Sequence, residues 1–267
     1  MVAERLEPVS HLVTQVALDA VAVHHDWRIG REQRLDPEQT RFESVFGQVV
    51  REGDVALDIG ANIGAHTLHI AQSVGSSGRV IAIEPTDFAY AKLCRNLALN
   101  PALAARVETH QAMLVAPGGK TEAEPVYSSW PLAAAGDRHP LHLGQLMSVG
   151  GARAQTLDEL LAPAGLARVD LVKIDIDGHE VAALRGARET LQRFHPVIVM
   201  ELAPYVLRER GASLAELLDL LGDLGYRFID ADTDSALPFD AAQLEAIIPH
   251  GGCRNVIAFP QARQGGR

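Results

Sequence analysis

Four acidic side chains lie at or near the ends of short apolar runs in this 267-residue sequence: Asp58, Glu84, Asp175 and Glu201. A carboxylate at the carboxyl end of a buried strand can bind a cation, accept hydrogen bonds from hydroxyl groups or accept a proton. Ligands of open α/β sheets bind outside the carboxyl ends of the strands, so we expect these acids to surround one ligand site.

The segment around the first of these acids predicts a strand, a glycine turn and a helix N-terminus. The strand begins at Val55, the turn contains Gly60 and Gly64, and the helix that follows includes Thr67. Glycine lets the backbone approach a ligand closely, and the free N–H groups at the start of the helix face that ligand. Such a unit is typical of nucleotide-binding sites.

The spacing of the glycines indicates which nucleotide-containing ligand the turn binds. A dinucleotide fingerprint has the form G-x-G-x-x-G, whereas this chain has Gly60-x-x-x-Gly64, with Asn62 in place of the middle glycine. Asp58 would repel a diphosphate but attract the ammonium group of an amino acid, directly or through water. We therefore expect S-adenosylmethionine as the cofactor and keep an NAD-dependent oxidoreductase as the disfavoured alternative.

The next two predicted strands supply further contacts to this cofactor. Glu84 lies at the carboxyl end of the second strand, just before Pro85, where an acid can accept both ribose hydroxyls. Its alternative role is to cap the following helix. The third strand ends at Gln111 and Ala112, where we expect the adenine, with Ala112 contributing only its backbone.

Transfer of a methyl group to oxygen needs an acceptor that is held in line and a base for its proton. Asp175, which ends the fourth predicted strand, is the first candidate, as base or as ligand of a divalent ion; alternatively it bonds backbone amides of the next turn. His179 is either a base or a residue that packs locally. Glu201 either orients the acceptor or joins Asp175 at a metal. Two acids would suit Mg²⁺ better than Zn²⁺, but a metal is not the favoured interpretation.

Three neighbouring residues receive structural interpretations. Asp177 is expected to be the N-cap of the following helix, and Glu180 its capping-box acid. Lys173 is expected to be a strand residue with a partner at the surface.

Strands and helices alternate along the chain, which predicts a doubly wound, mainly parallel, seven-stranded Rossmann-like α/β sheet with helices on both faces. Capping residues at Thr156 and Ser213 mark two helix starts, and one helix is expected from 177 to 194. The expected strands begin at 55 and then span 79–84, 107–112, 169–175, 196–202, 226–230 and 255–259.

The chain divides into an N-terminal extension or cap at 1–35, a domain at 36–260 and a loose tail at 261–267. Within the domain, residues 117–155 are rich in Pro, Gly, Ser and His, and such an irregular segment in an enzyme is usually a functional loop or lid. Its Tyr127 and Trp130 either cover the acceptor or form a small satellite core.

Composition limits the partners and the location of the protein. The formal charge of −10 makes nucleic acid an unlikely ligand, and no apolar run reaches the roughly 18–20 residues of a membrane span. Cys94 and Cys253 have no metal-finger spacing and are expected to be buried thiols in a reducing compartment. The acidic N-terminus does not resemble a signal peptide, so we expect a cytoplasmic protein. The partner we expect is a small-molecule or saccharide acceptor, a class that the family resemblance described next implies. Homo-oligomerisation is left open.

Four segments together resemble the successive motifs of FkbM-type, S-adenosylmethionine-dependent methyltransferases. They are Asp58-Ile-Gly-Ala-Asn-Ile-Gly64, Val80-Ile-Ala-Ile-Glu84-Pro85, Thr156-Leu-Asp-Glu-Leu160 and Lys173-Ile-Asp-Ile-Asp-Gly-His-Glu180. The resemblance covers roughly residues 36–260; one departure is Asp177, where the family more often has Glu. It implies O-methylation of hydroxyl groups on sugars, glycans or secondary metabolites, as in natural product biosynthesis. The alternative from another class is a non-catalytic, cofactor-binding regulatory partner.

Overall fold

The structure is a computed structural model, and it describes residues 45–119, 125–128 and 145–261. The predicted N-terminal extension, most of the predicted tail and Trp130 lie outside these ranges, so the proposed division of the chain stays a prediction. Among the described residues, no helix combines the length and the apolar character needed to cross a membrane.

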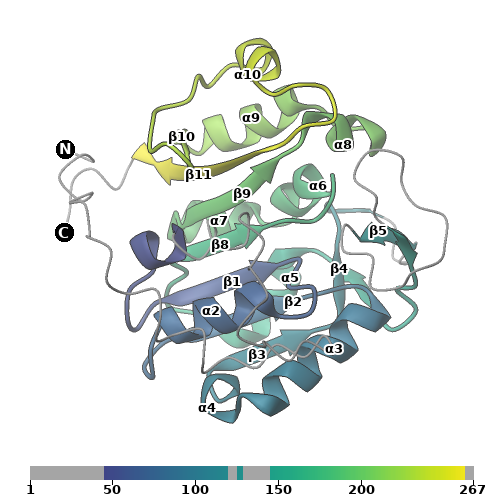
Figure 1. The fold of residues 1–267 in the computed structure, drawn as a ribbon, viewed down its shortest axis with the longest axis vertical. Helices are drawn as coiled ribbons and strands as arrows, with labels where there is room; N and C mark the ends of the chain where they lie inside the picture. Colours follow the sequence, from purple (N-terminus) through teal and green to yellow (C-terminus); the bar gives the residue numbers. More distant parts are fainter. Residues whose placement is uncertain (1–44, 120–124, 129–144, 262–267) are drawn as a thin grey trace, which may run out of the picture.

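Seven strands form one sheet in the order β10-β11-β9-β8-β1-β2-β3, and Figure 1 shows this order from β10 at the top to β3 at the bottom. All neighbouring strands are parallel except β11, which is antiparallel to both β9 and β10. The predicted fold class is confirmed. The strands are β1 (Val55–Ile59), β2 (Arg79–Ile83), β3 (Val107–His110), β8 (Leu171–Ile174), β9 (Val197–Leu202), β10 (Tyr226–Asp230) and β11 (Arg254–Pro260).

Helices cover both faces of this sheet, and the residues of β1 alternate between two cores. Leu57 and Ile59 pack in a core that includes leucines from the helices between residues 157 and 223, whereas Ala56 packs with residues 45–50, which are largely helical, and with residues 70–74. Strands buried on both faces read as continuous Val, Ile and Leu runs, which is why the sequence reveals them. The helices are α2 (Ala65–Ser73), α3 (Asp87–Leu99), α4 (Pro101–Ala104), α5 (Leu157–Leu161), α6 (Glu180–Arg185), α7 (Arg188–Phe194), α8 (Pro204–Glu209), α9 (Leu214–Asp223) and α10 (Ala241–Ile247).

The helix starts predicted at Thr156 and Ser213 are confirmed. Thr156 and Ser213 form complete capping boxes with Glu159 and Glu216, each side chain bonding the backbone N–H of the other residue. The expectation of one helix from 177 to 194 is wrong, because α6 and α7 separate at Gly186. A Cβ there would lie 2.4 Å from the carbonyl oxygen of Val115, so the backbone of another segment packs directly against this corner.

The third predicted strand, 107–112, is also divided. It consists of β3 and of β4 (Ala112–Leu114), and β4 leaves the main sheet to pair with β7 (Arg153–Gln155). The irregular segment 117–155 therefore ends in a strand, and it also contains a hairpin of β5 (Val126–Ser128) and β6 (Gln145–Met147). Gln111, a predicted site residue, lies at the point where the chain turns from β3 into β4.

Both cysteines are exposed, so the expectation of buried thiols is wrong. Cys94 lies in α3, whose buried stripe consists of Ala89, Leu93, Asn96 and Leu97. Cys94 directly follows the buried Leu93, but its side chain points away from the buried stripe and is exposed.

A charged cluster holds the amino ends of β1 and β8 together. Arg168 donates to Asp54 at 2.9 Å and to both oxygens of Asp170 at 2.6 and 2.8 Å. Asp170 also accepts the backbone N–H of Val55 at 3.0 Å. This cluster fixes the two central strands at the end of the sheet opposite to the predicted site.

Candidate functional site

Four strands of the sheet end at the same level, and a fifth, β9, passes this level and ends two residues later, at Leu202. Ile59 pairs with Ile83 and Ile174 in the register, Ile83 pairs with His110, and Ile174 pairs with Met200. Each strand therefore delivers its next residue to the same edge of the sheet. These next residues are Gly60, Glu84, Gln111, Asp175 and Glu201, all of which the sequence predicts as site residues.

The turn after β1 lies against the ends of both neighbouring strands. The N–H groups of Gly60 and Ala61 both donate to the carbonyl of Ile83, at 2.9 and 3.0 Å. Gly60 has a φ of +78°, and a Cβ at this position would lie 1.9 Å from the carbonyl oxygen of Asp175. Gly64 has a φ of +92° and begins α2. Glycine at position 60 is therefore required for conformation and for space.

Asp58 is fully buried, and another buried side chain of the protein is its counterion. Its neighbour in the β1–β8 register is Lys173, whose ammonium lies 3.1 Å from Asp58 Oδ1. Thr67, in α2, donates its hydroxyl to Asp58 Oδ2 at 2.6 Å. The expectation of a surface partner for Lys173 is wrong, because this side chain is only 1% exposed. The sequence signal was its place inside an apolar strand, where a lysine needs an acidic partner.

Glu84 is also buried, and the protein uses most of its acceptor positions. Oε2 accepts the N–H of Asn62 at 2.9 Å, and Oε1 accepts the N–H and the hydroxyl of Thr86 at 2.9 and 2.5 Å. Burial raises the pKa of Glu84, while the bonds from Thr86 and Asn62 and the charge of Lys173 oppose this shift. Glu84 thus ties the glycine turn to the start of α3, whose N-cap Thr86 makes no side-chain bond to that helix.

Asn62, in the turn after β1, has a left-handed backbone with a φ of +49°. Its Oδ1 is buried and has no hydrogen-bond partner among the residues that the structure describes. A buried polar group without a partner costs free energy, and a ligand that donates a hydrogen bond would remove this cost.

Gln111 belongs to a cluster that sequence reasoning missed. Its side-chain amide donates to Asp87 Oδ1 at 2.7 Å, and Asp87 also accepts the hydroxyl of Ser148 at 2.6 Å. The N–H groups of Gly150 and Gly151 donate to the same carboxylate, and these bonds, with that of Ser148 foremost, lower the pKa of Asp87. Asp87 thereby ties the start of α3 to the segment before β7.

The last two predicted contacts with the cofactor occupy neighbouring positions. Pro85 is half-buried between Glu84 and Thr86, and Ala112 is buried as the first residue of β4. Ala112 pairs with Arg153 in the β4–β7 register.

The turn between β8 and α6 differs from its prediction. Asp175 reaches the edge with its side chain 38% exposed and 3.9 Å from the ammonium of Lys173. Asp177 has a left-handed φ of +50°, and the N-cap of α6 is His179, so the expectation that Asp177 is the cap is wrong. Glu180 is the first residue of α6, and its carboxylate turns back to accept the N–H groups of Gly178 and Ile176 at 3.3 and 3.4 Å.

Burial changes the titration of two side chains in this turn. It raises the pKa of Glu180 to about 7, against the bonds from the backbone, and the charges of Asp175 and Asp177 add to the increase. Burial, helped by the nearby charge of Arg210, lowers the pKa of His179 to about 4. His179 Nε2 is buried without a hydrogen-bond partner in the described part of the chain.

Glu201 lies within β9, and the helix α8 that follows carries Tyr205, which the sequence analysis did not select. Burial, followed by the negative charge of Glu201, raises the pKa of Tyr205 to about 12, so its hydroxyl stays protonated and can donate. The Tyr205 ring meets that of His250 at an angle of 67°, with centroids 6.5 Å apart. Within the three described ranges, no group of three or more His, Cys, Asp or Glu side chains is placed to hold a metal ion.

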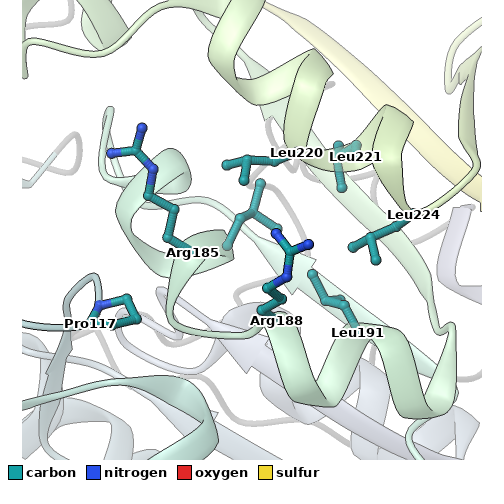
Figure 2. A pocket seen from close by; sticks show the side chains of 8 residues that line it. Pro117, Arg185, Arg188, Leu191, Leu220, Leu221 and Leu224 are labelled. Atoms are coloured by element: carbon teal, nitrogen blue, oxygen red, sulfur yellow. The ribbon is translucent and has the colours of Figure 1, made fainter.

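A cavity of about 260 Å³ lies away from this edge, in the helical layer. Figure 2 shows Leu220, Leu221 and Leu224 opposite Leu191, with Arg188 projecting between them and Arg185 at the left of the view. Its lining contains none of the five residues at the level edge, so it is separate from the candidate site.

Comparison with known proteins agrees with this arrangement. The model of the methyltransferase FkbM domain matches residues 58–228. Hexuronic acid methyltransferase AglP of Haloferax volcanii is 28% identical over 180 residues, which are 67% of this chain and 66% of that protein, just under two thirds of its length.

Two solved structures are more distant. A methyltransferase FkbM from Methylobacillus flagellatus is 16% identical, with a TM-score of 0.48 over 81% of this chain and 50% of that chain. An S-adenosylmethionine-dependent O-methyltransferase from Thermotoga maritima is 17% identical, with a TM-score of 0.45 over 86% of this chain and 67% of that chain. The family match itself runs from the end of β1 into β10, and on this ground the chain belongs to the FkbM family of methyltransferases.

Proposed function

We propose that this methyltransferase uses S-adenosylmethionine to methylate a hydroxyl group of a sugar, a glycan or a secondary metabolite. The observation that carries the proposal is the level edge of the sheet, where a glycine turn and the acids Glu84 and Asp175 meet. The name of the Haloferax relative, which acts on a hexuronic acid, supports a saccharide acceptor.

The residues at this edge fit an adenosyl ligand with an ammonium group. The buried Oδ1 of Asn62 offers an acceptor for that ammonium. An ionised carboxylate has about four acceptor positions, and the protein fills three of those of Glu84, so about one is left for a ribose hydroxyl. Gln111 and Ala112 lie at the next strand end, where the adenine is expected.

The bound cofactor would supply a methyl group that is activated by a positive sulfur. The protein must then hold the acceptor in line and take the proton that its hydroxyl loses. We assign the proton to the carboxylate of Asp175, because this side chain is partly exposed at the edge. His179 is the second candidate, but it is largely buried, and its pKa of about 4 makes it a weak base. Glu201 and Tyr205 would orient the acceptor.

Calorimetry with S-adenosylmethionine, S-adenosylhomocysteine and NAD tests the choice of cofactor. We expect both adenosyl ligands to bind and NAD not to bind. A protein that binds neither adenosyl ligand would rule out this function, and one that binds NAD would favour the oxidoreductase.

Transfer of a labelled methyl group to a panel of hexoses, hexuronic acids and hydroxylated metabolites then tests catalysis. We expect label in at least one saccharide of the panel. Tight binding of the cofactor without transfer to any acceptor would instead favour the non-catalytic regulatory partner.

A further inference from the structure

We propose that Lys173 is a positioning residue whose ammonium holds the turn from Gly60 to Gly64 in its ligand-binding conformation, with Asp58 as its counterion. The inference rests on the proposed cofactor and gives the lysine of the Lys-Ile-Asp motif a role inside the site. It also changes the role of Asp58 from ligand contact to internal support.

The contacts of the Lys173 ammonium connect β8 with β1 and the glycine turn. Nζ donates to the carbonyl of Gly60 at 2.7 Å and approaches that of Ile59 at 3.4 Å. It lies 3.1 Å from Asp58 Oδ1 and 3.9 Å from Asp175 Oδ2. One buried cation thus touches the first residue of the turn and the carboxylate that we propose as the base.

The charge of Lys173 is maintained despite its burial. Burial would lower the pKa of a lysine, but the nearby charges of Asp58 and Asp175, with a smaller effect of Glu84, raise it. Lys173 therefore stays protonated at physiological pH and can donate to Gly60.

Asp58 and Thr67 hold the Lys173 ammonium in place. Thr67 donates to one oxygen of Asp58 and the ammonium contacts the other, so α2, β1 and β8 are joined through a single buried carboxylate. Because Asp58 is fully buried and pairs with Lys173, the ammonium of a ligand is left to Asn62 Oδ1.

Two variants separate this positioning role from simple charge balance. Lys173→Met leaves Asp58 buried and unpaired, so we expect a lower melting temperature together with weaker binding of S-adenosylhomocysteine. The double variant Lys173→Met/Asp58→Asn removes both charges, and replacing a buried ion pair by neutral groups is often tolerated. We expect this double variant to recover most of the melting temperature but to bind S-adenosylhomocysteine about tenfold more weakly than wild type, because Gly60 has lost its donor.

A matched control breaks an ion pair with a buried carboxylate on β10 and β11, which β9 and β8 separate from the glycine turn. Arg254, in β11, pairs with the fully buried Asp230 of β10. Arg254→Met should lower the melting temperature without changing the affinity for S-adenosylhomocysteine.

The double variant gives the deciding measurement, since it should fold even where Lys173→Met does not. Wild-type affinity for S-adenosylhomocysteine in the folded double variant would overturn the positioning role while leaving the proposed function intact. Absence of binding by the wild-type protein would instead remove the proposed function itself. A third variant, Lys173→Arg, keeps the charge and should bind better than the double variant.

Discussion

Two carboxylates at the candidate site, Glu84 and Asp175, differ in how many hydrogen bonds and ion pairs they already make within the protein. Three hydrogen bonds hold Glu84 in place, so this residue can position a ligand but has little freedom to move. The side chain of Asp175 is 38% exposed, and its nearest described cation lies 3.9 Å away. A proton acceptor needs access to the reacting hydroxyl, which at this edge favours Asp175.

Replacement of Asp175 by asparagine tests this assignment. The amide keeps the shape of the side chain but accepts no proton, so we expect turnover to fall by about 10²–10⁴ with little change in affinity for S-adenosylhomocysteine. Kinetics and calorimetry on the same preparation measure the two effects. His179→Gln is the comparison, and a larger loss of turnover in that variant would move the base to His179.

Glu180 should make the stability of the protein depend on pH. Its pKa is about 7 in the folded protein and about 4.5 in the unfolded chain, so unfolding releases a proton between these values and stability falls as the pH rises through this window. Glu180→Gln removes the effect. The free energy of unfolding of this variant, measured relative to that of wild type, should be about 2.5 kcal/mol higher at pH 8 than at pH 5.

Urea unfolding at both pH values measures this difference. Glu189→Gln, at an exposed position of α7, is the control and should show no comparable gain. If Glu180→Gln changed the free energy of unfolding by the same amount at pH 5 and at pH 8, as expected for Glu189→Gln, the assignment to Glu180 would be contradicted.

At the scale of elements, the site depends on turns whose backbones lie against other strands. The turn after β1 meets the carbonyl of Asp175 after β8, and the corner between α6 and α7 meets that of Val115 after β4. Both contacts require glycine for space, at positions 60 and 186. The geometry of the edge is therefore set by contacts between turns as well as by the sheet.

Two glycine substitutions separate conformation from space. Gly60 and Gly225 have φ values of +78° and +77°, but only at position 60 would a Cβ meet another atom within 4 Å. Gly60→Ala should therefore abolish measurable binding of S-adenosylhomocysteine, while Gly225→Ala should cost about 1 kcal/mol of stability and leave binding unchanged. Calorimetry and urea unfolding of both variants check this, and normal binding by Gly60→Ala would show that the turn can move.

At the scale of the whole molecule, the two ends of the sheet have different tasks. The carboxyl ends carry the candidate site, whereas the amino ends of β1 and β8 are held by Arg168 between two buried acids, Asp54 and Asp170. Loss of this arginine should affect folding without affecting the ligand.

Arg168→Met should lower the free energy of unfolding by about 1–3 kcal/mol, because two buried carboxylates lose their donor. Its control, Arg208→Met, breaks an exposed pair with Glu245 and should change that free energy by less than about 0.5 kcal/mol. Urea unfolding gives both values. Affinity for S-adenosylhomocysteine should stay unchanged in both variants, and a loss in Arg168→Met would mean that the two ends are coupled.

The sequence predicted those features that depend on residues close together in the chain. The central strands β1, β2, β8 and β9 appeared as apolar runs, and the capping boxes at Thr156 and Ser213 could be seen within four residues. The burial of Lys173 could not, because it depends on Asp58, 115 positions earlier, as its neighbour in the sheet. The break at Gly186 likewise depends on a carbonyl that another segment brings there.

The common register of these five strands at the site also determines which changes of length the protein can accept. One residue inserted within β8 would move Asp175 by about 3.3 Å and turn the following side chains to the opposite face of the sheet. An insertion beyond the strand ends, as between β5 and β6, leaves the register intact. Descendants of this chain can therefore acquire new acceptors through insertions and deletions in their loops, while the strands keep the machinery for the methyl donor at constant length.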